Sequence, residues 1–102
     1  MTSSDNVNSL SLQLLAVGYN LHSEKSPDHG ASIDDHEVQL TVTRDRLWNS
    51  GFQAAGEIID AAVKLIIHAR NACAEIVKAW LAFAKHAVYL SYRALTLGVN
   101  VG

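Results

Sequence analysis

The 102-residue chain has one cysteine, one proline and no run of about 18 uncharged apolar residues. A single cysteine excludes a disulfide scaffold and a zinc site built only from cysteines, and it favours a reducing compartment. The missing apolar run excludes a transmembrane span. Asp5 stands where a signal peptide would have its basic region. We therefore expect a cytoplasmic protein, in the cytoplasm of the host cell if its origin is viral.

Positive charge is also scarce, with 8 Lys and Arg against 10 Asp and Glu and a net charge of −2. This balance excludes a nucleic-acid binder that works by overall basicity. The 49% of hydrophobic residues excludes a disordered polymer, and the length supports one domain. The charge is unevenly divided, because residues 1–60 carry nine acids and three bases, whereas residues 61–102 carry one acid and five bases. Such a division favours head-to-tail contact between copies or with a charged partner.

The first half of the chain has the pattern of strands. Residues 1–8 show no period and are expected to form a flexible arm. Apolar and polar side chains alternate over residues 10–14 and again over residues 38–43, as in strands with one buried face. The segment between them, residues 23–35, is acidic and carries the only proline, which is typical of a loop. We predict an antiparallel β-hairpin over residues 9–43 with an acidic loop at 23–35.

The second half has the pattern of a helix. Residues 44–97 contain no proline, and the charged and polar side chains from Glu57 to Arg93, apart from Arg70, recur at about 100° per residue within one arc. That phase continues through Asn71, so we predict one long helix over residues 44–97. The fold class is then α+β, with residues 9–102 as a single domain. The alternative is a helical hairpin that bends near residues 68–73 and closes a small bundle by itself.

The predicted helix is apolar over more than half of its circumference, wider than the stripe of about 100° on a normal surface helix. Two short strands do not cover such a surface, so another copy, another protein or a lipid must cover it. We predict a homo-oligomer, most simply an antiparallel dimer. Its interface is expected to consist of large apolar side chains on the helix, namely Ile59, Val63, Ile66, Val77, Trp80, Leu81, Phe83 and Val88.

Arg70 is the one helix charge in the middle of the apolar arc. An unpaired buried guanidinium is very costly, so it must find an acidic partner. Two interpretations stay open. Arg70 either pairs with an acid of this protein, or it is reserved for the acidic group of another protein; the acids concerned in the first case are Asp34, Asp35, Glu37 and Asp45.

The sequence carries no arrangement typical of catalysis. No Ser/His/Asp or Cys/His pairing and no glycine-rich phosphate loop is present. His22, His29 and His36 recur every seven residues among acids, but this spacing matches no compact metal motif. We therefore expect no enzyme, no cofactor and no metal.

These observations predict a non-catalytic, intracellular protein-binding module, an inhibitor or accessory protein of viral or mobile-element origin. It would dock on a larger protein with a basic surface, and no nucleic acid is expected. The predicted contact residues are four acids of the hairpin together with one base of the helix: Asp28, Asp34, Asp35, Glu37 and Arg70. The alternative is a protein that acts on a membrane or lipid surface through the cationic, aromatic segment 76–97, which holds no acid.

Trp48 and Gly51 lie at mid-chain, before an alanine-rich helix. They resemble the central Trp-x-Gly motif of the small secreted helical-hairpin proteins. The motif here is one residue longer, and strands rather than a helix are expected before it. We therefore assign the chain to no family.

Overall fold

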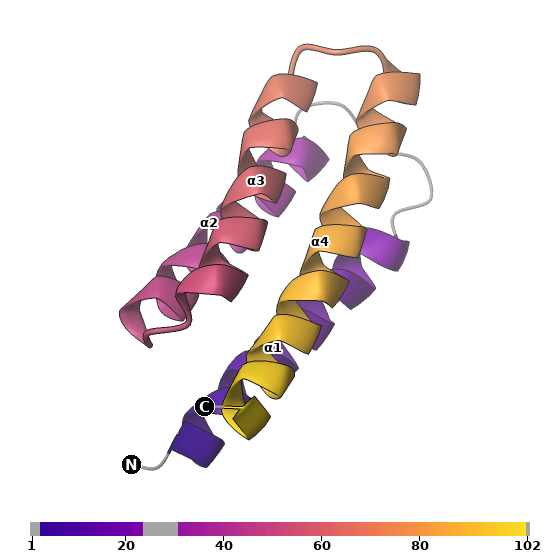
Figure 1. Ribbon diagram of the computed structural model, residues 1–102. Helices are drawn as coiled ribbons and strands as arrows, with labels where there is room; N and C mark the ends of the chain where they lie inside the picture. Colours follow the sequence, from indigo (N-terminus) through magenta and orange to yellow (C-terminus); the bar gives the residue numbers. More distant parts are fainter. Residues whose placement is uncertain (1–2, 24–30, 102) are drawn as a thin grey trace.

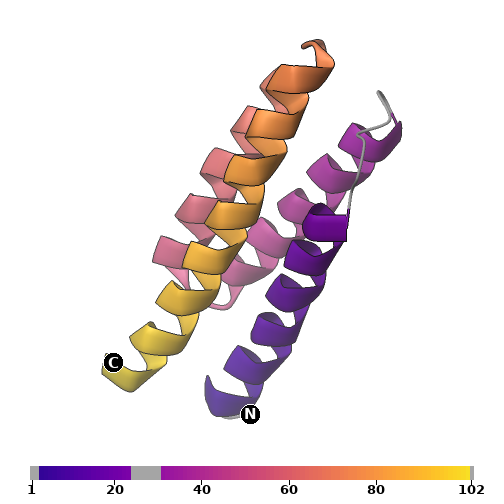
Figure 2. The same cartoon turned by 90° about the vertical axis from the view of Figure 1, so that its right-hand side faces the viewer.

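The computed structural model describes residues 3–23 and 31–101, and all of its regular structure there is helical (Figure 1). The helices are α1 (Ser3–Ser23), α2 (Ala31–Asn49), α3 (Gln53–Ala69) and α4 (Ala74–Val101). Successive helices run in opposite directions, and α4 returns beside α1, as the two views show (Figures 1 and 2). The result is an up-down-up-down four-helix bundle with extents of 43 × 21 × 18 Å. The predicted α+β class is therefore wrong.

The strand predicted near residue 10 is part of α1. The buried apolar side chains of this helix are Val7, Leu10, Leu14, Val17 and Leu21, alternately three and four residues apart, which is the spacing of one helix face. The alternation of Leu10, Leu12 and Leu14 concealed the helical period. In the helix Leu10 and Leu14 share the buried face, whereas Leu12 points to solvent. The arm predicted at residues 1–8 is likewise helical from Ser3 onward.

The second predicted strand is part of α2. Its buried residues are Ile33, His36, Leu40, Thr43 and Leu47, again at helical spacing, while Val38 and Val42 are exposed. The β-branched residues of this segment favour a strand locally, and packing against α3 overrides that preference. Of the predicted acidic loop, residues 31–35 lie in α2, and residues 24–30 fall outside the described part of the chain. The β-hairpin over 9–43 is thus replaced by two helices.

The helix predicted over 44–97 is interrupted twice. The first interruption follows α2, where Gly51 has a φ of +86° and the N–H groups of Gly51 and Phe52 donate to the carbonyls of Trp48 and Leu47 at 3.1 and 2.9 Å. This is the Schellman arrangement that ends many helices, and the positive φ favours glycine. The chain then reverses and α3 begins at Gln53.

The second interruption covers residues 70–73, between α3 and α4. It contains neither proline nor glycine. Four residues are close to one helical turn of 3.6, so the apolar pattern of α4 continues almost in phase with that of α3. The periodicity of apolar residues along the sequence therefore does not reveal the turn. The bend near residues 68–73, weighed as the alternative to a continuous helix, is the arrangement that the structure has.

Candidate functional site

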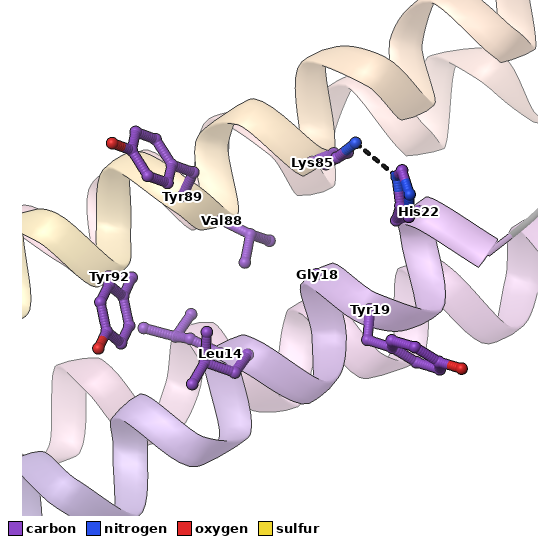
Figure 3. A pocket seen from close by; sticks show the side chains of 9 residues that line it. Leu14, Gly18, Tyr19, His22, Lys85, Val88, Tyr89 and Tyr92 are labelled. Atoms are coloured by element: carbon purple, nitrogen blue, oxygen red, sulfur yellow. Dashed lines mark hydrogen bonds between the residues drawn. The ribbon is translucent and has the colours of Figure 1, made fainter.

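An open groove of about 440 Å³ lies between α1 and α4 (Figure 3). We call it the α1–α4 groove. Most of its lining is apolar or aromatic. Helix α1 contributes Leu14, Leu15, Gly18, Tyr19 and His22, and α4 contributes Lys85, Val88, Tyr89 and Tyr92.

Two adjacent helix faces position these side chains. Leu14 and Val88 are buried and form the floor, and Figure 3 shows both pointing into the space between the helices. A methyl group on Gly18 would lie 3.4 Å from Val88 Cγ1, so the helices approach closely at that level. The groove is therefore a depression over a packed floor.

Apolar side chains are left exposed along the walls of the groove. Tyr19 on α1 is 71% exposed, and Leu15 and Tyr89 are each 54% exposed. Exposed apolar side chains gathered beside an apolar groove are typical of interaction sites. Tyrosine is well suited to such a site because it offers a rigid apolar ring and a polar hydroxyl.

One end of the groove is polar and cationic. Lys85 Nζ donates a hydrogen bond to His22 Nδ1 at 2.6 Å (Figure 3). An ammonium group only donates hydrogen bonds, so His22 Nδ1 is the acceptor in this contact. The pair places one positive charge at the end of an apolar groove, where an acidic group of a ligand would be attracted.

Two of the predicted contact acids, Asp34 and Glu37, lie elsewhere, near the turn between α3 and α4. Arg70 Nε donates to Asp34 Oδ1 at 3.1 Å, and Arg70 Nη2 pairs with Glu37. Of the two interpretations of Arg70, the structure shows the ion pair within the chain. The Arg70 side chain is 42% exposed, so it does not lie in the middle of a buried face as expected. Asp35 is exposed, and Asp28 lies outside the described residues.

Most of the predicted oligomer interface is inside the bundle. The side chains of this set that belong to the core are Ile59, Val63, Ile66, Val77, Leu81 and Val88. Trp80 is half-buried against that core, with its ring edge-on to His68 at 6.2 Å between centroids. Phe83 is exposed. The helices of one chain therefore cover much of the apolar arc that was expected to need a second chain.

A second ion-pair cluster joins α2 to α3. Arg44 Nη1 donates to Asp60 Oδ1 at 2.7 Å, and Lys64 Nζ lies 3.1 Å from Asp60 Oδ2. Hydrogen bonds from Arg44 and Lys64 hold the pKa of the Asp60 carboxyl below its ordinary value. The Arg44 guanidinium also lies over the Trp48 ring, 4.9 Å from its centroid. These contacts join α2 to α3 and stabilise their packing.

The sequence prediction missed the groove because its α1 wall was interpreted as a strand. In a strand Leu15 and Tyr19 share a face with every second residue, whereas in a helix they lie beside Gly18 and His22. The sequence signal for this helix face was the spacing of Leu15, Gly18, Tyr19 and His22, which are one, three or four residues apart. Among the described residues, no group of three or more His, Cys, Asp or Glu side chains is placed to hold a metal ion.

Comparisons of the chain with protein-family models, with curated proteins and with solved structures find no match. None of the helices in the described part of the chain combines the length and the apolar character needed to cross a membrane. Trp48 does lie at the end of a helix and Gly51 in the turn that follows, contrary to the strands expected before this motif. The motif is still one residue longer than Trp-x-Gly.

Proposed function

We propose that the protein is a non-catalytic protein-binding module whose contact surface is the α1–α4 groove. The observation that carries the proposal is the set of apolar side chains, Leu15, Tyr19 and Tyr89, left exposed around a preformed apolar depression. The proposal keeps the protein-binding role predicted from the sequence. It moves the contact surface, because Asp34 and Glu37 are already engaged by Arg70.

The shape and charge of the groove favour an amphipathic helix as its occupant. The groove runs between two antiparallel helices, so a third helix presents apolar side chains to it at i, i+3 and i+7. Lys85 at one end favours a partner that carries a carboxylate beside its apolar face.

A display library of amphipathic helical peptides, panned on the wild-type protein, tests this function. We expect enriched peptides with two or three large apolar residues on one face and an acid near its end. Replacing that acid by its amide should weaken binding about tenfold, as should Lys85→Gln. The double variant Tyr19→Ala/Tyr89→Ala should lose the peptides.

The matched control is Val38→Ala/Val42→Ala, which also removes two exposed apolar side chains, from α2. It should bind the selected peptides as the wild type does. Equal binding by the Tyr19→Ala/Tyr89→Ala protein would contradict the proposal, as would a library that yields no enriched sequence.

The second candidate function is binding to an anionic lipid surface through α4. The observation that favours it is the exposure of Lys78, Lys85 and Arg93 on a helix segment, 76–97, without an acid. Co-sedimentation with vesicles of phosphatidylserine and phosphatidylcholine tests it. The lipid role requires binding that is lost when the three bases are replaced by glutamine, and absence of wild-type binding removes it.

A further inference from the structure

Helix α4 carries two apolar seams, and the bundle uses one of them. The inward seam includes Val77, Leu81, Ala84 and Val88, all buried. A second seam, which we call the outer seam, lies next to it. Its members are spaced alternately four and three residues apart, and they are Ile76, Trp80, Phe83, Ala87, Leu90 and Ala94.

The outer seam is only partly covered by its own chain. Phe83 is 59% exposed, Ile76 is 43% exposed and Leu90 is 38% exposed. The other three members are half-buried and pack against the edge of the core. Alternating four- and three-residue spacing is the pattern by which a helix packs along the length of another helix.

We infer that the outer seam of α4 binds the same seam of a second copy, with the two α4 helices antiparallel across a twofold axis. Side-chain sizes along the seam fit this pairing. In one register Phe83 lies opposite Ala87 of the second copy, Trp80 opposite Leu90, and Ile76 opposite Ala94. Large residues then face smaller ones in every layer, as close packing of a two-stranded seam requires.

Charge selects the same orientation and register. Glu75 and Arg93 are both exposed, and they are 18 residues apart, which is five helical turns. They therefore lie on the same side of α4, about 100° around the helix from the centre of the seam, and the Arg93 guanidinium lies 5.9 Å from the centroid of the Tyr89 ring. In the antiparallel register Glu75 and Arg93 of the second copy lie at nearly the same height along the helix axis, with an axial offset of about 3 Å. A parallel pairing, whose twofold axis runs along the helices, would place these charges of the two copies on opposite flanks of the interface, where Glu75 and Arg93 do not meet.

This interface differs from the one predicted by sequence. Six of the eight residues named there are core residues of the bundle, and only Trp80 and Phe83 belong to the outer seam. It also differs from the α1–α4 groove, which is lined by the opposite flank of α4, with Lys85 and Tyr89. A dimer formed through the outer seam leaves both grooves open.

Sedimentation equilibrium over a wide concentration range tests the inference. The wild-type protein should be a dimer, and Phe83→Glu should weaken association about a hundredfold or more, because it places a charge at the centre of the seam. Ala82→Glu introduces the same charge at the neighbouring exposed position and should leave the dimer unchanged. Circular dichroism and thermal unfolding check that both variants keep the helical fold.

Charge exchange tests the register. Glu75→Arg and Arg93→Glu should each weaken the dimer, and the double variant should recover most of the wild-type association. A wild-type protein that is monomeric at every concentration overturns the inference. The inference is also overturned if Ala82→Glu and Phe83→Glu weaken the dimer equally. The same holds if the double charge-exchange variant associates no more strongly than the single variants.

The outcome is independent of the groove. Phe83→Glu should still bind the peptides selected on the wild type, and Tyr19→Ala, which leaves the contact between Arg93 and Tyr89 intact, should still dimerise. Failure of peptide binding alone therefore rejects the proposed function, whereas failure of dimerisation alone rejects the outer-seam interface.

Discussion

The indole ring of Trp48 lies directly against the backbone of Gly56, so that α2 and α3 approach closely near their shared turn. A methyl group placed on Gly56 would overlap Cδ1 and Nε1 of that ring. Gly56 is buried inside α3, where alanine is normally favoured over glycine by up to about 1 kcal/mol. The close approach explains why a glycine occupies this helical position.

Gly56→Ala should therefore destabilise the protein by about 1–3 kcal/mol, because the overlap with Trp48 outweighs the gain in helix propensity. Urea unfolding monitored by circular dichroism measures the change. Gly18→Ala is the matched control, since a methyl group there meets Val88 Cγ1 at an ordinary 3.4 Å. The control should be neutral or stabilising, and a similar loss in both variants would contradict the steric explanation.

Leu12 and Leu14 distinguish the helix from the strand. In the predicted strand both side chains point to the buried face, whereas in α1 Leu14 is fully buried and Leu12 is 68% exposed. Leu14→Ala should cost about 2–5 kcal/mol, and Leu12→Ala should change the free energy of unfolding by less than about 0.5 kcal/mol. Equal losses measured by urea unfolding would favour the strand.

The same two residues show why the fold could be predicted only in part. Leu10, Leu12 and Leu14 show a period of two over five residues, and the longer helical period from Val7 to Leu21 was overlooked. A short alternating run is compatible with either structure until packing decides. The helical character of residues 53–97 was evident because its period extended over many turns.

The break between α3 and α4 could not be predicted for a different reason. Residues 70–73 take up almost one helical turn, so period alone does not distinguish a turn from continuous helix. No glycine or proline marks the position. The prediction of one continuous helix left its whole apolar arc uncovered. Core residues such as Ile66 and Val77 were therefore assigned to an oligomer interface.

The candidate site followed from the fold in the same way. The pairing of Arg70 with Asp34 and Glu37 was among the alternatives, because a charge in an apolar arc demands an acid. The α1–α4 groove was not predicted, because it exists only when residues 3–23 form a helix that packs beside α4. Tyr89 and Lys85 were identified only as members of an aromatic, cationic segment.

Asp60 makes the stability of the bundle depend on pH in acid. Its hydrogen bonds from Arg44 and Lys64 lower its pKa in the folded state below the ordinary value of 3.8. Near and below that value the unfolded chain binds more protons than the folded one, so stability falls as pH falls. The contribution of Asp60 is fully present above the ordinary pKa and is lost as pH decreases through the lowered one.

Asp60→Asn should therefore be less stable than the wild type at neutral pH, and the difference should shrink as pH falls below about 4. Urea unfolding of both proteins at a series of pH values measures it. Asp35→Asn is the control, since Asp35 is exposed and lies outside this cluster. A difference between wild type and Asp60→Asn that stays constant down to the lowest pH would contradict the assignment.

Arg70 links the turn between α3 and α4 to the first turns of α2 through Asp34 and Glu37. Because the guanidinium is 42% exposed, water and salt screen these pairs, and their removal should cost little. Arg70→Gln should lower the free energy of unfolding by about 0.5–1 kcal/mol at low salt and by less at high salt. A double-mutant cycle with Glu37→Gln separates the pair from the effects of each substitution. A loss of several kcal/mol that salt does not reduce would show that Arg70 is a buried structural charge, as its place in the apolar arc of the sequence first indicated.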